Sequence, residues 1–126
     1  MPDPLRVETG WPAPALSPNA RPNRWDKAHA VRVAKKEGYA MALVGGALHW
    51  PGRHHDGRFK LTIHAAPAVE RGRDDDNLIA STKAHRDGIA AALKVDDKRF
   101  DTQPLIWLPQ PRDKRARLTF MIEPVP

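Results

Sequence analysis

Hydrophobic and polar side chains alternate most strictly over residues 58–66. A period of two residues is typical of a strand with one face buried and the other exposed. We therefore expect a strand here, with one face directed into the core. The apolar side chains of that face are Phe59, Leu61, Ile63 and Ala65.

Three other segments have strand character. Six of the 13 prolines lie in the proline-rich, extended segment 1–22, so only residues 5–9 of it are expected to pair as a strand. Residues 99–108 and 115–122 are predicted to be strands as well, the latter by its alternation. The short link 109–114 predicts that these last two strands form a hairpin.

Two helices are predicted between these strands. Asn23, with an aspartate three residues later, is a suitable helix start, and the helical pattern continues toward Gly45. A second helix is expected over residues 77–93, with Asp76 as its N-cap. This order of elements predicts one α+β domain over residues 1–126, with two main helices packed on one face of a mixed β-sheet.

The excess of basic over acidic residues indicates which kinds of partner the protein could bind. The chain has 21 lysines and arginines against 15 aspartates and glutamates, which gives a formal net charge of +6. Such an excess attracts polyanions, including nucleic acids and anionic membrane surfaces. The longest mostly apolar run, residues 39–48, is about half of what a bilayer requires, and the chain has no cysteine. We therefore expect a cytoplasmic protein that has no membrane partner.

Asp74, Asp75 and Asp76 form an acidic run directly before the second predicted helix. Adjacent carboxylates repel one another unless water or a cation compensates their charge. Carboxylate oxygens bind Mg²⁺ or Mn²⁺, and such ions activate water for attack on a phosphodiester. The alternative is structural: Asp76 caps the helix, and the two preceding acids are favoured by the helix dipole.

Lys83 and Asp87 follow on the same predicted helix. Around the axis of an unbroken helix, both lie within roughly 20° of Asp76, so the three residues form one stripe. A lysine in this position could stabilise a pentavalent phosphate or orient the attacking water. The alternative is an ordinary surface pair between residues i and i+4. Asp96 and Asp97 come after the helix and, by themselves, indicate a turn.

Together these residues resemble the signature of RusA-type Holliday-junction endonucleases. That signature contains Asp-x-Asp-Asn, a helical lysine with an aspartate four residues on, and a closing Asp-Asp. The similarity covers residues 73–100, about a quarter of the chain, and residues 16–21 resemble the family's segment after the first strand. In the family pattern the lysine stands about one turn earlier, at the position of Ala80. Lys83 therefore implies a three-residue insertion, which leaves it on nearly the same helix face.

The resemblance implies a Mg²⁺-dependent endonuclease, with Mn²⁺ as a possible substitute, that resolves four-way DNA junctions in recombination and repair. It implies that Asp74, Asp76 and Asp97 are catalytic metal ligands assisted by Asp96, and that Lys83 stabilises the transition state. It also implies a RusA-like fold, a homodimer, and a phage or prophage setting.

The length of the second helix sets a geometric condition. If that helix is unbroken, Asp76 and Leu93 lie about 25 Å apart, whereas the four steps from Leu93 to Asp97 recover at most about 14 Å. Either the helix ends early, for example at Gly88, or Asp97 completes the site of a second subunit. We favour the second interpretation, because a dimer suits the two-fold symmetry of a four-way junction.

Basic residues in several segments are candidates for phosphate contacts. They are Arg21, Arg24, Lys27, Arg73, Arg112, Lys114, Arg115 and Arg117. The four tryptophans can either stack on unpaired bases or belong to the core. Two other functions are compatible with these features. One is a nuclease directed at flaps, forks or ordinary duplex, and the other is a non-catalytic DNA-binding protein whose acidic run is solvated surface.

Overall fold

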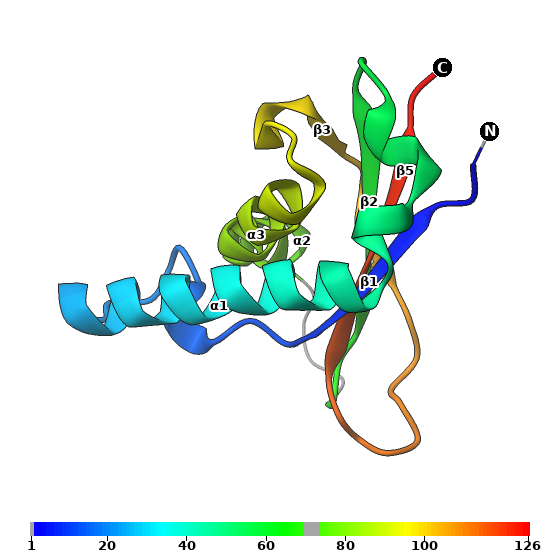
Figure 1. The fold of residues 1–126 in the computed structure, drawn as a ribbon. Helices are drawn as coiled ribbons and strands as arrows, with labels where there is room; N and C mark the ends of the chain where they lie inside the picture. Colours follow the sequence, from blue (N-terminus) through cyan, green and yellow to red (C-terminus); the bar gives the residue numbers. More distant parts are fainter. Residues whose placement is uncertain (1, 70–73) are drawn as a thin grey trace.

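The computed structural model describes residues 2–69 and 74–126 and shows a single small α+β domain (Figure 1). Its mixed sheet has five strands, and strand pairing runs in the order β1-β5-β2-β3, with β4 also paired to β2. The strands are β1 (Leu5–Gly10), β2 (Phe59–Ala66), β3 (Phe100–Thr102), β4 (Ile106–Trp107) and β5 (Arg117–Pro124). The first two predicted strands are therefore confirmed to within one residue at each end.

The predicted terminal hairpin is wrong. β4 runs parallel to β2, with Ile106 opposite His64, whereas β5 lies on the other side of β2 and runs antiparallel to both β2 and β1. The reason is burial: β5 has a fully apolar inner face that benefits from neighbours on both sides, while Ile106 on β4 is exposed and suits an edge.

The single strand predicted over residues 99–108 is two short strands in the structure. Between β3 and β4 lies Pro104, which has no N–H to donate to a ladder. The preceding residue, Gln103, still donates its backbone N–H to Leu61 O on β2, at 2.8 Å. The segment therefore stays beside β2 although its pairing is interrupted.

Three α-helices lie on the same side of the sheet (Figure 1). They are α1 (Arg24–Val44), α2 (Asp75–Ser81) and α3 (Lys83–Leu93), and short 3₁₀ helices cover Pro14–Leu16, Ala47–His49, Pro51–His54 and Asp97–Arg99. The predicted start of α1 is confirmed, because the Asn23 side chain accepts a hydrogen bond from Asp26 N at 2.8 Å. α1 packs on α3 and on the sheet. None of the helices in the described part of the chain is both long and apolar enough to cross a membrane.

The second predicted helix is in fact two helices that meet at Thr82. The Ser81 hydroxyl donates to Asn77 O at 2.8 Å, and the Thr82 hydroxyl donates to Ile79 O at 2.7 Å. Hydroxyls that bond back to preceding carbonyls compete with the helical ladder and bend or break it. The adjacent Ser81 and Thr82 are thus a sequence signal for a break that periodicity alone conceals.

α1 and α3 cross at a point where each helix has a glycine. A Cβ on Gly38 would lie 2.3 Å from His85 O, and a Cβ on Gly88 would lie 2.1 Å from Lys35 O. The two backbones therefore touch directly, with no side chain between them. This close approach fixes α3, and with it Lys83, against α1.

Candidate active site around Lys83

Lys83, the first residue of α3, connects two acidic residues that are distant in sequence. Its Nζ donates to Asp87 Oδ1 at 2.6 Å and to Asp97 Oδ2 at 2.5 Å. The lysine side chain is 56% exposed and the Asp97 side chain 38% exposed, so the group lies at the surface. The helical lysine, the aspartate four residues on and the closing aspartate of the motif thus meet within one chain.

Asp97 reaches Lys83 because the chain turns back at the end of α3. Lys94, the C-cap of α3, has φ of 58° and ψ of 42°, which is the left-handed region. Val95 N then donates to Ala90 O at 3.0 Å, as in a Schellman turn. This reversal runs the following residues back along α3, so the contact between Asp97 and Lys83 needs no second subunit.

The ion pairs of Lys83 shift the pKa values of its members in opposite directions. Hydrogen bonds from Lys83 to Asp87 and Asp97 raise the pKa of the lysine. The hydrogen bond from Lys83 lowers the pKa of Asp97. Both groups are therefore charged at neutral pH.

Arg86 is a cation of this site that sequence reasoning did not single out. Its Nε donates to Thr82 Oγ1 at 3.1 Å and one terminal nitrogen donates to Ile79 O at 3.1 Å, so the guanidinium holds the junction of α2 and α3. Burial lowers the pKa of Arg86, and the charges of Asp87 and Asp97 oppose that shift. The site is thus a group of two cations and two carboxylates.

The acidic run 74–76 has a different arrangement from the one predicted. Asp74, not Asp76, is the N-cap of α2, because its Oδ1 accepts from Asn77 N at 3.0 Å. The helix begins earlier than expected and so takes the first acid as its cap. Asp75 accepts a hydrogen bond from the indole nitrogen of Trp107 at 2.9 Å, and Asp76 is exposed on the first turn.

The described residues contain no group of three or more aspartate, glutamate or histidine side chains arranged to hold a metal ion. Asp96 caps the 3₁₀ helix that follows it, accepting from Lys98 N at 2.9 Å, and Asp97 is engaged by Lys83. The predicted ligands are hard carboxylate oxygens, which suit Mg²⁺. In this structure, however, they do not form a closed protein cage.

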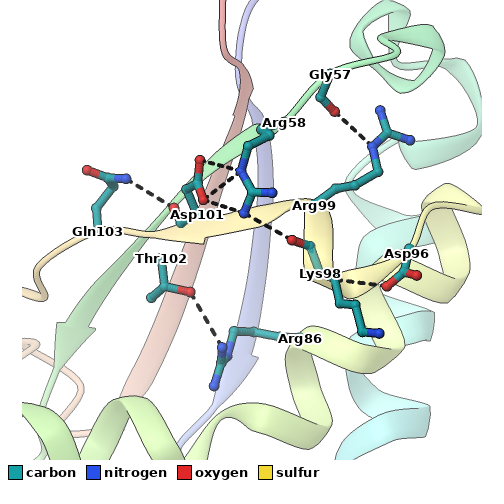
Figure 2. A network of polar contacts seen from close by, with 9 residues as sticks. All are labelled: Gly57, Arg58, Arg86, Asp96, Lys98, Arg99, Asp101, Thr102 and Gln103. Carbon is teal, nitrogen blue, oxygen red and sulfur yellow. Dashed lines mark hydrogen bonds and ion pairs between the residues drawn. The ribbon is translucent and has the colours of Figure 1, made fainter.

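Figure 2 shows the polar contacts that hold the segment around Asp97 in place. Arg58, the residue before β2, donates from its Nε to both carboxylate oxygens of Asp101, at 2.8 and 2.9 Å, and from a terminal nitrogen to Lys98 O at 3.0 Å. Arg99 donates to Gly57 O at 2.8 Å. A terminal nitrogen of Arg86 lies 3.4 Å from Thr102 Oγ1 on β3. These contacts fix the stretch from Asp97 to β3 against both the sheet and α3.

The basic residues predicted to contact phosphate fall into separate places. The beginning of α1, with Arg21, Arg24 and Lys27 in or next to it, projects away from the sheet, whereas the loop before β5 extends below it (Figure 1). In that loop Arg112, Lys114 and Arg115 are exposed, whereas Arg117, the first residue of β5, forms an ion pair with Asp113. Arg73 lies outside the described residues. Among the described residues, the basic positions near the start of α1 are thus separate from those near the start of β5.

A cavity of about 260 Å³ lies next to the acidic run. Asp74 and Asn77 border it on the side of α2, and Ser17 borders it on the side of the N-terminal segment. Two tryptophans complete its wall: Trp11, after β1, and Trp107, on β4, with ring centroids 6.3 Å apart and planes tilted by 40°. Local sequence patterns do not predict that these two rings meet, because 96 positions separate them.

Comparison with known proteins places the chain beside one relative. No model of a known protein family matches it. It is similar to an uncharacterized protein from Xylella fastidiosa strain Temecula1, with 42% identity over 98 residues. The matched region makes up 76% of this chain and 62% of the relative, so the chain spans less than two thirds of that protein's length.

Proposed function

We propose that this domain is a RusA-like, Mg²⁺-dependent endonuclease that hydrolyses phosphodiester bonds in four-way DNA junctions. The observation that carries the proposal is the contact of Lys83 with both Asp87 and Asp97. These residues belong to the motif that resembles the RusA signature. Their convergence is what a reaction site built on that motif requires.

The charge state of Lys83 decides the role that it can have. Because hydrogen bonds raise its pKa, the ammonium stays protonated at neutral pH and does not serve as a general base. An ammonium has three N–H groups, and two of them bind Asp87 and Asp97. We assign the third to an oxygen of the scissile phosphate, where a fixed positive charge stabilises the charge that develops in the transition state.

The carboxylates fit the metal in their chemistry. Mg²⁺ is commonly held by only one or two protein carboxylates, with water and substrate phosphate completing its shell, so a three-carboxylate group is not required. The resemblance assigns the ion to Asp74, Asp76 and Asp97, with Asp96 assisting; because these carboxylates form no group of three among the described residues of one copy, one or two of them would hold the ion there. When bound, the ion would lower the pKa of the attacking water and offset the phosphate charge.

The proposal includes a homodimer that acts on branched DNA. The contact of Asp97 with Lys83 within one chain does not join Asp97 to Asp74 and Asp76, which form no metal-binding group with it among the described residues. A second subunit would supply the missing ligands, and a dimer also suits the two-fold symmetry of the junction. Mixing Asp74→Asn subunits with Asp97→Asn subunits tests whether a site is shared. Recovered nicking supports a shared site, and its absence assigns each site to one chain.

The test of function is nicking of a synthetic four-way junction compared with a matched duplex, in Mg²⁺ and in Mn²⁺. We expect junction-selective nicking that Asp76→Asn and Asp97→Asn abolish. Asp3→Asn removes a comparable exposed charge in the segment before β1, away from the motif and from the contacts around Asp97, and should leave the rate unchanged. Faster cleavage of flaps or forks would assign a different branched substrate. DNA binding that ignores Mg²⁺, with no nicking of any substrate, would identify a non-catalytic DNA-binding protein.

A further inference from the structure

The cavity beside the acidic run has the composition of a site for a flat aromatic ligand. Trp11 and Trp107 line it together, and Trp11 is 37% exposed. Trp50, in contrast, is 6% exposed and packs with Phe59 in the core. Trp11 is thus not a core tryptophan that reaches the surface by chance, since its ring forms part of a concave wall.

Polar groups at the rim of the cavity can form hydrogen bonds with the edge of such a ligand. Asn77 accepts a hydrogen bond from the Ser17 hydroxyl at its Oδ1, at 2.9 Å. Its Nδ2 is therefore the atom that can donate to an acceptor in the cavity. Asp74 binds Asn77 N through Oδ1, which leaves Oδ2 as an acceptor on the same rim. One donor and one acceptor side by side match the hydrogen-bonding edge of a nucleobase.

The size of the cavity points to a small ligand. Its volume of about 260 Å³ is below the roughly 300–1,000 Å³ of pockets for drug-sized molecules. Trp107 is also tied by its indole nitrogen to Asp75, which holds this wall in a fixed place beside the acidic run. A ligand in the cavity would therefore lie next to the proposed reaction site.

We propose that the cavity lined by Trp11, Trp107 and Asn77 takes one unpaired nucleobase of the DNA substrate. This inference rests on the proposed function, because the base would come from the branch point of the junction. Stacking on an aromatic ring tolerates any base sequence, whereas paired bases inside a duplex cannot enter the cavity. The cavity thereby distinguishes branched or distorted DNA from ordinary duplex.

The first test leaves the protein unchanged and alters the DNA. Fluorescence anisotropy, with Ca²⁺ in place of Mg²⁺ to suppress cleavage, measures the Kd for a duplex with one unpaired adenine and for the same duplex with an abasic nucleotide there. We expect the unpaired base to improve binding at least about five-fold, the lower range for stacking of one base. Equal Kd values for the two duplexes would overturn the inference.

The second test assigns the effect to the cavity. Trp11→Leu should abolish the difference between the base and the abasic site, whereas Trp25→Leu should retain it, because Trp25 is 72% exposed on α1 and outside the cavity. A difference that survives Trp11→Leu in a folded protein would overturn the assignment. Nicking of junctions in Mg²⁺ is scored separately. Nicking without base discrimination refutes only the cavity, and base discrimination without nicking refutes only the nuclease.

Discussion

The Nζ of Lys83 lies 2.5 Å from Oδ2 of Asp97, fourteen residues later in the chain. This contact lowers the pKa of Asp97 and, together with Asp87, raises that of Lys83. A carboxylate whose pKa falls on folding stabilises the fold above its unfolded pKa and loses that effect as the pH falls through the folded value. A lysine whose pKa rises on folding stabilises the fold below its unfolded pKa, and that stabilisation is lost as the pH rises through the folded pKa.

Replacing Lys83 by methionine should therefore return the pKa of Asp97 toward its ordinary value. The change is measured by the ¹³C chemical shift of the Asp97 carboxyl group during a pH titration. Lys98→Met is the matched control, because Lys98 is exposed on the adjacent 3₁₀ helix and has its backbone, not its ammonium, in the polar network. An Asp97 titration unaffected by Lys83→Met would contradict the contact.

Asp74 allows folding and function to be separated. Asn is as good an N-cap as Asp, so Asp74→Asn should keep α2 stable while removing a proposed metal ligand. Asp74→Ala also removes the cap and should lower the free energy of unfolding by about 0.5–2 kcal/mol. Urea unfolding and junction nicking, measured on both variants, check this. Full nicking by Asp74→Asn would exclude the carboxylate from the reaction.

The close contact of α1 and α3 at Gly38 and Gly88 predicts that adding a methyl group at either glycine strongly lowers stability. Gly88→Ala and Gly38→Ala would each bring a Cβ within 2.3 Å or less of a backbone oxygen. We expect each to destabilise the protein by about 1–3 kcal/mol or more, measured by urea unfolding, because a backbone cannot move aside cheaply. Gly10→Ala is the control: its Cβ would meet only Glu37 Oε2, at 3.6 Å. Wild-type stability of Gly88→Ala would show that the helices can separate freely.

Glu37 satisfies a buried histidine between α1 and α3. Its Oε1 lies 2.7 Å from Nε2 of His85, which is 2% exposed, and the other ring nitrogen of His85 has no partner among the described residues. Glu37→Ala should cost about 1–3 kcal/mol, because it leaves a buried polar group unsatisfied. Glu37→Gln keeps a hydrogen bond and should cost less. Thermal and urea unfolding measure both variants, and a Glu37→Ala variant as stable as Glu37→Gln would contradict this role.

Sequence patterns predicted the parts of the fold that depend on local order. The strand at β2, the beginning of α1 and the α+β class follow from alternation, capping and element order. The placement of β5 between β1 and β2 could not be predicted in this way, because two strands adjacent in sequence need not pair. The choice between neighbours is made by the burial of Phe120 and the residues beside it.

Several residues of the candidate site could be predicted from the sequence, but their arrangement in space could not. The motif singled out Lys83, Asp87 and Asp97, but the geometric condition set by the helix length concerned only the distance between Asp76 and Asp97, and the contact of Asp97 with Lys83 was not predicted. The contact depends on the left-handed turn at Lys94, which periodicity does not reveal. The pairing of Trp11 with Trp107 and the contact of Arg86 with Thr102 have no local signal, since each joins segments that are distant in sequence.

The contact between Lys83 and Asp97 depends on the left-handed backbone conformation of one residue, Lys94. A β-branched residue there would resist a φ of 58°, whereas glycine would adopt it without strain. Exchanging Lys94 for valine or for glycine would thus loosen or tighten the tether between Asp97 and Lys83 while every charged group of the motif stays in the sequence. The reaction site could therefore be tuned from a position that takes no part in its chemistry.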